Sequence, residues 1–457
     1  MVSRWRLLLA AAVLHVAVVL TIYSAGRLQL LPDTFDVNGI GVSFAIDSRS
    51  YRIEATEMSD LLHQARFSDW ISYNSQFHVK LYSLSFALLG PVFGFNILSA
   101  EPLNLAYYLS ILTLVYAVGR KAFDSEVGLI AAGIVSVWPS LLLHTTQMLR
   151  DPLFIAALLL LVLILLAGVT SSFSWAQAFL AAAAGTGACV LLWRSRGDMW
   201  ELVFAIVLIG IGMIVAYQFK KRQILLGNIL FSTLLFSSVL LIPRIVPTYR
   251  QPDHSLVLAP HVAGNYRAAA PAQAATLAPA GSVKQIDSPS WTRLADRIGL
   301  LRHKFIISYP LAGSNIDATV ELKGIRDIIG YFPRAILIGF FSPFPNMWFA
   351  RGEQVGVVGR LVSGAETLMM YAIVALALLS LVMNRRRLPV WLIVLIAAIG
   401  CTALGYVVVN ISTLYRMRYA FWILLIVLAA STIQCIRESR VLSLRSEKHT
   451  ENLPSVV

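Results

Sequence analysis

Apolar stretches long enough to cross a membrane recur along the whole chain and are separated by shorter polar segments. The hydrocarbon core of a bilayer is about 30 Å thick, and about 20 helical residues cross it. The pattern therefore predicts an all-α polytopic membrane protein with about ten transmembrane helices. The predicted helices cover 7–24, 102–119, 126–144, 152–170, 175–193, 200–217, 223–243, 366–384, 389–410 and 419–436.

Two further apolar segments, 78–98 and 333–350, contain prolines and glycines that disfavour a regular straight helix. If both were full crossings, the part of the chain between them would be inverted, and its basic clusters would change sides. Irregular backbone is tolerated at membrane depth only where it lies against protein or lines a water-filled cavity. We therefore expect both segments to be interfacial or re-entrant helices on the outer side.

Lysine and arginine are concentrated in alternate loops, and this bias predicts the orientation of the chain. The positive-inside rule assigns loops rich in these residues to the cytoplasm. With the N-terminus inside, every dense basic cluster falls on one side, so we expect both termini to be cytoplasmic. The clusters are Arg4 with Arg6, Arg120 with Lys121, Lys220 to Arg222, Arg385 to Arg387, and the group from Arg437 to Lys448.

This topology divides the chain into transmembrane parts, two large outer loops and a tail. The predicted parts are an N-terminal transmembrane core over 1–243 that includes the first outer loop 25–101, a second outer loop over 244–365, C-terminal transmembrane helices over 366–436, and a cytoplasmic tail over 437–457. Within the second outer loop, 251–290 is rich in alanine and proline and is expected to be disordered. Apolar periodicity returns from Trp291 onward, which predicts ordered structure there.

Composition agrees with a lipid-embedded chain. Charged residues make up 13% of the sequence, about half the usual fraction of roughly 25% in soluble proteins. The net charge of +13 lies in the loops between apolar runs, so it follows the positive-inside pattern and does not indicate a nucleic-acid partner. Cys189, Cys401 and Cys435 all lie in apolar runs, which predicts neither a disulfide framework nor a thiolate metal site.

The predicted topology gathers several polar residues at the outer end of the helices. Ionisable groups at the mouth of a helical bundle are costly unless they are paired or hydrated, so each is a candidate site residue. Carboxylates with arginines among them suit a reaction that deprotonates one group and holds a phosphate. The candidates are Asp47, Glu101, Arg150, Asp151, Arg194, Arg196, Asp198, Tyr415, Arg416 and Arg418.

Some of these residues also have a purely structural interpretation. Asp151 and Glu101 each precede a proline and a predicted helix, so either could be a helix cap. Arg194 and Arg196 could serve as interfacial anchors. Arg416 and Arg418 are less easily explained in this way, because positive charge on the outer side runs against the positive-inside bias.

The motifs resemble those of the GT-C superfamily of polytopic membrane glycosyltransferases. The likeness is closest to the branch of the dolichyl-phosphate-mannose protein mannosyltransferases and the aminoarabinose transferases. Four stretches carry it, and their order and common side of the membrane matter more than any one of them. They are Asp47-Ser-Arg-Ser-Tyr51, LYSLSFALLGPVFG followed by EPLNLAYYLSILTLVYAVGRKAF, IAAGIVSVWPSLLLHTTQMLRDPLF, and TLYRMRYAFWILLIVLAA.

The resemblance implies inverting transfer of a sugar from a polyprenyl-phosphate donor to a glycan, lipid or protein acceptor. It assigns a catalytic base to Asp47 and supporting roles to Asp151 and Glu101. A divalent metal such as Mg²⁺ or Mn²⁺ would fit if these three carboxylates converge. The residues expected to bind substrate are Tyr51, Arg150, Arg194, Tyr415, Arg416 and Arg418. We expect a bacterial inner membrane enzyme of cell-envelope polysaccharide biosynthesis, with its active site on the periplasmic or extracellular side.

Other classes of membrane protein share parts of this pattern. A polysaccharide polymerase or ligase would use the second outer loop, with Asp47 dispensable. A transporter is disfavoured, because the predicted spans lack charged residues at their midpoints and no repeat relates the two halves. A structural membrane scaffold is a further alternative. The loop residues that suit a polymerase or ligase are Arg293, Arg297, Arg302, His303, Arg326 and Arg334.

Overall fold

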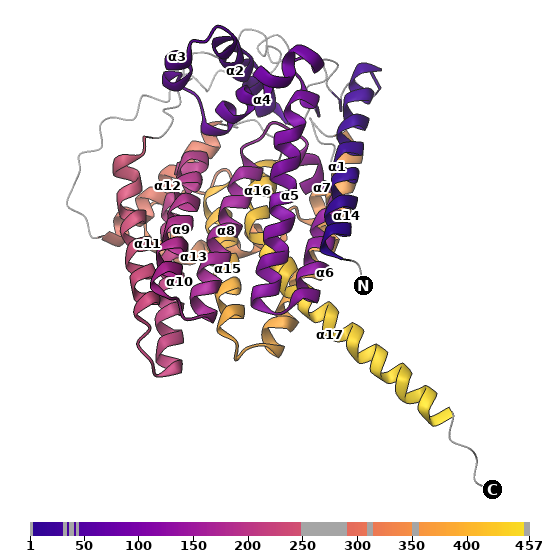
Figure 1. Ribbon diagram of the computed structural model, residues 1–457, viewed down its shortest axis with the longest axis vertical. Coiled ribbons are helices and arrows are strands. Elements are labelled where there is room, and N and C mark those ends of the chain that lie inside the picture. The colour runs from indigo at the N-terminus through magenta and orange to yellow at the C-terminus, as the bar shows by residue number, and fades with distance from the viewer. Residues whose placement is uncertain are drawn as a thin grey trace.

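The computed structural model describes residues 3–30, 34–35, 41–42, 45–247, 290–308, 314–349 and 356–451. Regular structure in these residues is helical, apart from two isolated β-bridges, Phe35 with Val42 and Asn315 with Asn410. Most helices stand side by side in one bundle; α2, α3 and α4 gather at one end, and α17 projects beyond the other (Figure 1). The predicted all-α class is therefore confirmed.

The helices follow one another with short connections over most of the chain. In order they are α1 Arg4–Arg27, α2 Ile46–His63, α3 Phe67–Ser72, α4 Phe77–Phe93, α5 Ile97–Ala122, α6 Ser125–Ser136, α7 Pro139–Thr145, α8 Asp151–Thr170, α9 Trp175–Arg196, η1 Gly197–Met199, α10 Trp200–Lys221, α11 Leu226–Ile245, α12 Ser290–Ser308, α13 Ile325–Phe341, η4 Pro345–Met347, α14 Gly356–Met383, α15 Leu388–Val407, α16 Ile411–Met417 and α17 Tyr419–Glu451.

Eight helical segments of the described chain are long and apolar enough to cross a membrane, or nine if α6 and α7 form one broken crossing. The protein is thus an integral membrane protein, with slightly fewer candidate spans than the ten predicted. One reason is that Trp175–Lys221 counts once, although it contains α9 and α10 with η1 between them. The orientation of the spans, with both termini cytoplasmic, stays a prediction.

The core of the bundle is built on α8 and α17. In each of these two helices, 72% of the most apolar stretch of 18 residues is buried. Asp151 is the only ionisable residue of α8, so this helix is apolar all round, as expected for a helix surrounded by others. It packs against α5 and α9, while α17 packs against α6, α14 and α15. These contacts hold the ends of α8 and α17 in fixed positions.

The predicted helix over 126–144 is wrong as a single element. The structure has two helices, α6 and α7, bent by 71° at the residues between them. Pro139 is the first residue of α7; it has no amide hydrogen and is favoured at a helix start. The Tyr108 hydroxyl donates to the carbonyl oxygen of Ser136 at 2.6 Å, which satisfies one backbone acceptor left free at the break.

Glycines let α13 and α15 approach closely. A Cβ atom on Gly405 would lie 2.0 Å from the carbonyl oxygen of Ala335, and one on Gly339 would lie 2.1 Å from that of Cys401. Small residues at such crossings allow close backbone contact between membrane helices. α13 covers much of the segment predicted over 333–350, and α4 covers most of 78–98. Their interfacial placement stays a prediction.

Three loop and tail predictions have different outcomes. The Ala/Pro-rich segment 251–290 lies outside the described residues, except for Ser290, which begins α12. The ordered structure expected from Trp291 onward is confirmed by α12. The predicted end of the last helix at residue 436 is wrong, because α17 continues to Glu451 without a break.

Candidate functional site

Charged side chains from four distant parts of the chain meet near α2. Asp47 lies in the first turn of α2, and Arg416 lies in α16. Arg150 and Asp151 stand at the start of α8, which α5 and α9 hold in place. Arg196 ends α9. We call these five residues the carboxylate–arginine cluster.

Two ion pairs hold the cluster together. The Arg416 Nη2 atom donates to Asp47 Oδ2 at 2.9 Å, and Arg196 donates directly to the Asp151 carboxylate. The Asp151 and Arg196 side chains are only 5% and 2% exposed, whereas those of Asp47 and Arg416 are 32% and 13% exposed. The Asp151–Arg196 pair is therefore sealed inside the protein, and the Asp47–Arg416 pair can be reached from outside.

Arg150 adds a third guanidinium group to the cluster. Its guanidinium makes no hydrogen bond or ion pair with any described residue. Burial disfavours its charged form, but Tyr51, Asp198, Asp151 and Asp47 together raise the pKa of Arg150. Three guanidinium groups thus lie among the carboxylates of Asp47, Asp151 and Asp198, and guanidinium groups that are kept charged in this way can bind an additional anion such as a phosphate.

Two aromatic side chains adjoin the cluster. Tyr51 lies one turn after Asp47 on α2, and its ring meets that of His78 on α4 edge to face, with centroids 4.5 Å apart. Burial raises the pKa of Tyr51, so its phenol stays neutral. Burial, and to a smaller extent nearby Arg150, lower the pKa of His78 to about 3, so the imidazole is uncharged at physiological pH.

Glu101 stands apart from the two aspartates. Its Oε1 atom bonds His15 Nδ1 at 2.9 Å, and His15 Nε2 lies 3.2 Å from Thr145 Oγ1. Among the described residues there is no group of three or more His, Cys, Asp or Glu side chains that could hold a metal ion. Asp47, Glu101 and Asp151, which would fit a divalent metal if they converged, therefore do not form such a group.

Neither Glu101 nor Asp151 caps a helix, so the structural interpretation of these two residues as helix caps is wrong. Glu101 lies inside α5, which begins at Ile97. The Asp151 carboxylate binds Arg196, and no side chain caps the start of α8. Both residues instead tie separate helices together.

Arg194 does not join the cluster, although it was the arginine of this turn that was expected to bind substrate. It donates to the carbonyl oxygen of Pro247 at 2.8 Å, and its guanidinium lies 5.5 Å from the centre of the Phe77 ring. Residues two apart on a helix point in directions about 200° apart. Arg196 therefore faces Asp151, and Arg194 faces elsewhere.

Arg418 is likewise separated from Arg416. It is fully buried, with Nη1 3.5 Å from Ser342 Oγ and Nη2 3.4 Å from Met370 Sδ. Its guanidinium stacks over the Tyr415 ring, with 4.7 Å to the ring centre. The two arginines, both expected to bind substrate, thus contact different surroundings, and Tyr415 accompanies Arg418.

A second polar group was not selected from the sequence. Glu366 on α14 accepts a hydrogen bond from Ser140 on α7, and the Ser140 hydroxyl also contacts the Tyr419 hydroxyl. Glu366 was predicted as the first residue of a span, where a charge is ordinary. α14 begins earlier, at Gly356, so the carboxylate is buried inside the bundle, where an ionisable group is a stronger functional signal.

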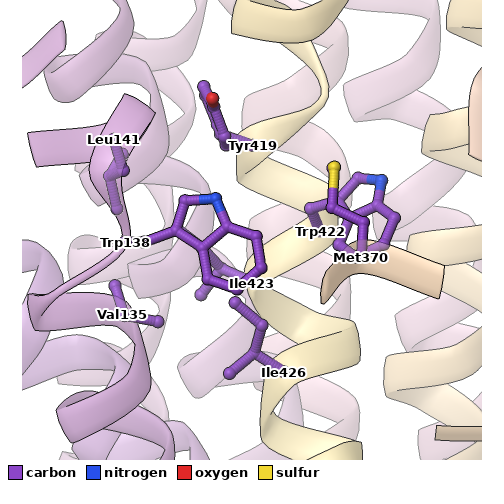
Figure 2. Close-up of a pocket in the computed structure, with 8 residues that line it drawn as sticks. All are labelled: Val135, Trp138, Leu141, Met370, Tyr419, Trp422, Ile423 and Ile426. Atoms are coloured by element: carbon purple, nitrogen blue, oxygen red, sulfur yellow. The ribbon is translucent and has the colours of Figure 1, made fainter. Parts of the chain in front are cut away.

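An apolar pocket lies beside this second polar group (Figure 2). The side chains from α17 and from the α6–α7 break face one another across it, and Met370 of α14 closes one side. Tyr419 belongs both to the pocket wall and to the contact with Ser140. The lining residues are Val135, Trp138, Leu141, Met370, Tyr419, Trp422, Ile423 and Ile426.

Comparison with models of protein families, with curated proteins and with solved structures finds no match for this chain. Function must therefore be argued from the cluster itself. Its chemistry combines an accessible carboxylate, a sealed carboxylate and a guanidinium that bonds none of the described residues.

Proposed function

We propose that the protein is a membrane glycosyltransferase that moves a sugar from a polyprenyl-phosphate donor to an acceptor on the outer face of the membrane. The observation that carries the proposal is the carboxylate–arginine cluster. In it, the reachable Asp47 lies beside Arg416 and near Arg150, whose guanidinium has no direct partner among the residues that the structure describes. This arrangement supports a reaction that needs one base and one phosphate-binding site.

The proposed reaction is a single displacement. Asp47 takes the proton of the acceptor hydroxyl as its oxygen attacks the anomeric carbon of the sugar. The bond from that carbon to the carrier phosphate oxygen breaks, and the phosphate leaves with its electron pair. Arg150 and Arg416 stabilise the negative charge that develops on the leaving group. One displacement inverts the configuration of the anomeric carbon.

The sealed pair has a supporting role in this proposal. Asp151 neutralises Arg196 inside the protein, so the positive charge directed toward a ligand comes from Arg150 and Arg416. Burial acts to lower the pKa of Arg416. Asp151 raises this pKa and so helps to keep the guanidinium charged. We therefore assign Asp151 a positioning role.

Two arginines of the second outer loop, Arg302 and Arg334, give no comparable support to a polymerase or ligase. Arg302 donates to the carbonyl oxygens of Val320, Tyr406 and Asp317 at 3.1, 2.8 and 2.7 Å. Arg334 binds the Asp317 carboxylate at 2.8 Å. These guanidinium groups hold the loop together and already have partners.

The test compares Asp47→Asn with a matched control, Asp69→Asn. Asp69 also belongs to the first predicted outer loop and forms an ion pair, but that pair with Arg66 is exposed. Each protein is supplied with a radiolabelled polyprenyl-phosphate sugar, and transfer is measured at equal membrane levels. We expect Asp47→Asn to slow transfer about a hundred- to ten-thousandfold, and the control to match wild type.

The possible results separate the parts of the proposal. If wild type transfers sugar and Asp47→Asn does so equally fast, the assignment of the base is wrong. If wild type leaves the labelled donor untouched, the transferase proposal itself is refuted.

A further inference from the structure

His78 is buried, and its ring has no hydrogen-bond partner in the part of the chain that the structure describes. Its side chain is 0% exposed, and neither Nδ1 nor Nε2 bonds any described residue. Native proteins satisfy nearly all buried polar atoms, so two unsatisfied nitrogens on one ring call for an explanation. A ligand that enters the carboxylate–arginine cluster is one group that could supply the missing partners.

The position of His78 supports this explanation. Its ring meets Tyr51, which belongs to the same helix as Asp47. It is also close enough to Arg150, Asp151 and Arg196 for their charges to shift its own pKa. The ring centre of Tyr82, which belongs to a cluster of buried hydrophobic residues, is 6.4 Å away. The imidazole therefore forms part of the boundary between the charged cluster and the hydrophobic core.

The chemistry of a neutral imidazole restricts the class of ligand. Whichever tautomer is present, one ring nitrogen donates a hydrogen bond and the other accepts one. A phosphate or carboxylate could use only the donor and would bind more strongly to the nearby Arg150. A cation would be repelled by Arg150 and Arg196. A hydroxyl group both donates and accepts, so it matches the imidazole.

We propose that His78 is a specificity-determining residue that binds a hydroxyl group of the transferred sugar. This inference rests on the proposed glycosyltransferase function and extends it to the recognition of the sugar. Arg150 and Arg416 bind the phosphate of the donor, and His78 distinguishes a donor that carries a sugar from the bare carrier lipid.

The first test measures the stability of the free protein. His78→Phe keeps the ring shape and removes both nitrogens, so it removes two buried groups that lack partners. Its melting temperature in detergent, without added lipid, should equal or exceed that of wild type. Tyr82→Phe is the matched control, because the Tyr82 hydroxyl donates to Asn104 Oδ1 at 2.6 Å and its loss should lower the melting temperature. A similar fall for His78→Phe would mean that the imidazole is already hydrogen-bonded in the free protein, which overturns the inference.

The second test measures binding of two probes, a polyprenyl-phosphate hexose and polyprenyl phosphate alone. Wild type should bind the hexose-bearing lipid more tightly than the bare lipid. His78→Phe should lose about tenfold or more of its affinity for the hexose-bearing lipid and keep its affinity for the bare lipid. His78→Gln, which retains a donor and an acceptor, should recover part of the loss.

Binding also separates this inference from the proposed reaction. If binding of the hexose depends on His78 but no sugar is transferred, the role of His78 in binding the sugar of a lipid-linked donor stands, and the transferase proposal falls. If wild type does not prefer the hexose-bearing lipid, or if His78→Phe keeps that preference, the inference is overturned whether or not transfer occurs.

Discussion

The sealed pair of Asp151 and Arg196 allows a quantitative prediction. Asp151→Leu leaves the Arg196 guanidinium buried without its counterion, where it is only 2% exposed. Breaking a buried ion pair from one side typically destabilises a protein by about 3–5 kcal/mol. We expect a loss of this size in the free energy of unfolding. Arg150 and Arg416 add positive charge nearby, so the loss should lie at the upper end.

The double variant Asp151→Leu/Arg196→Met separates the ion pair from the two individual residues. Replacing both charges with apolar side chains of similar size is often neutral or stabilising, because neither ion then has to lose its water. We expect its unfolding free energy to lie within about 1 kcal/mol of wild type. Unfolding is followed by tryptophan fluorescence during titration of detergent-solubilised protein with sodium dodecyl sulfate. The reasoning is refuted if the single variant is as stable as wild type, or the double variant as unstable as the single.

Three further predictions concern the frame around the site. Gly405→Val should lower the free energy of unfolding by about 4 kcal/mol or more, and the melting temperature with it, because its Cβ would lie 2.0 Å from the carbonyl oxygen of Ala335. An unchanged melting temperature would contradict this. Arg302→Met should cost about 3 kcal/mol in a detergent-unfolding titration, because three backbone carbonyls lose their donor. The Arg334 bond holds the pKa of Asp317 below its usual value, so it contributes stability above the unfolded pKa of about 3.9 that is lost as pH falls through the folded pKa. The difference in melting temperature between wild type and Arg334→Gln should therefore be present at pH 6 and shrink below about pH 4, and a constant difference would refute the linkage.

Apolar run length was enough to predict most of the helices, because lipid requires long apolar segments. α8 begins and ends within a residue of its predicted bounds, 152–170. The break between α6 and α7 could not be read from the same signal, because the apolar run continues through it and a proline can also be accommodated in a kinked helix. The length of α17 was missed because its polar end no longer resembles a membrane span.

The sequence was enough to predict which site residues lie at the same end of the bundle, but it did not predict how they pair. Asp47 and Arg416 are 369 residues apart, and the alternation of apolar helices was the signal that allowed them to be grouped. The choice between Arg194 and Arg196 depends on the rotation of α9 about its axis, which the apolar pattern does not define closely at the helix end. The pairing of Glu101 with His15 depends on how α1 packs against α5, a contact between surfaces that both look simply apolar in sequence.

The continuous helix α17 has a practical consequence. It begins next to Arg418, remains one element for 33 residues, and leaves the bundle before it ends (Figure 1). Such a helix is about 50 Å long, so a tilt of about 5° at its root would move its tip by about 4 Å. A spin label near Glu451 would thus report a rearrangement around Arg418 as a movement of the far end of α17, without any probe being placed in the interior.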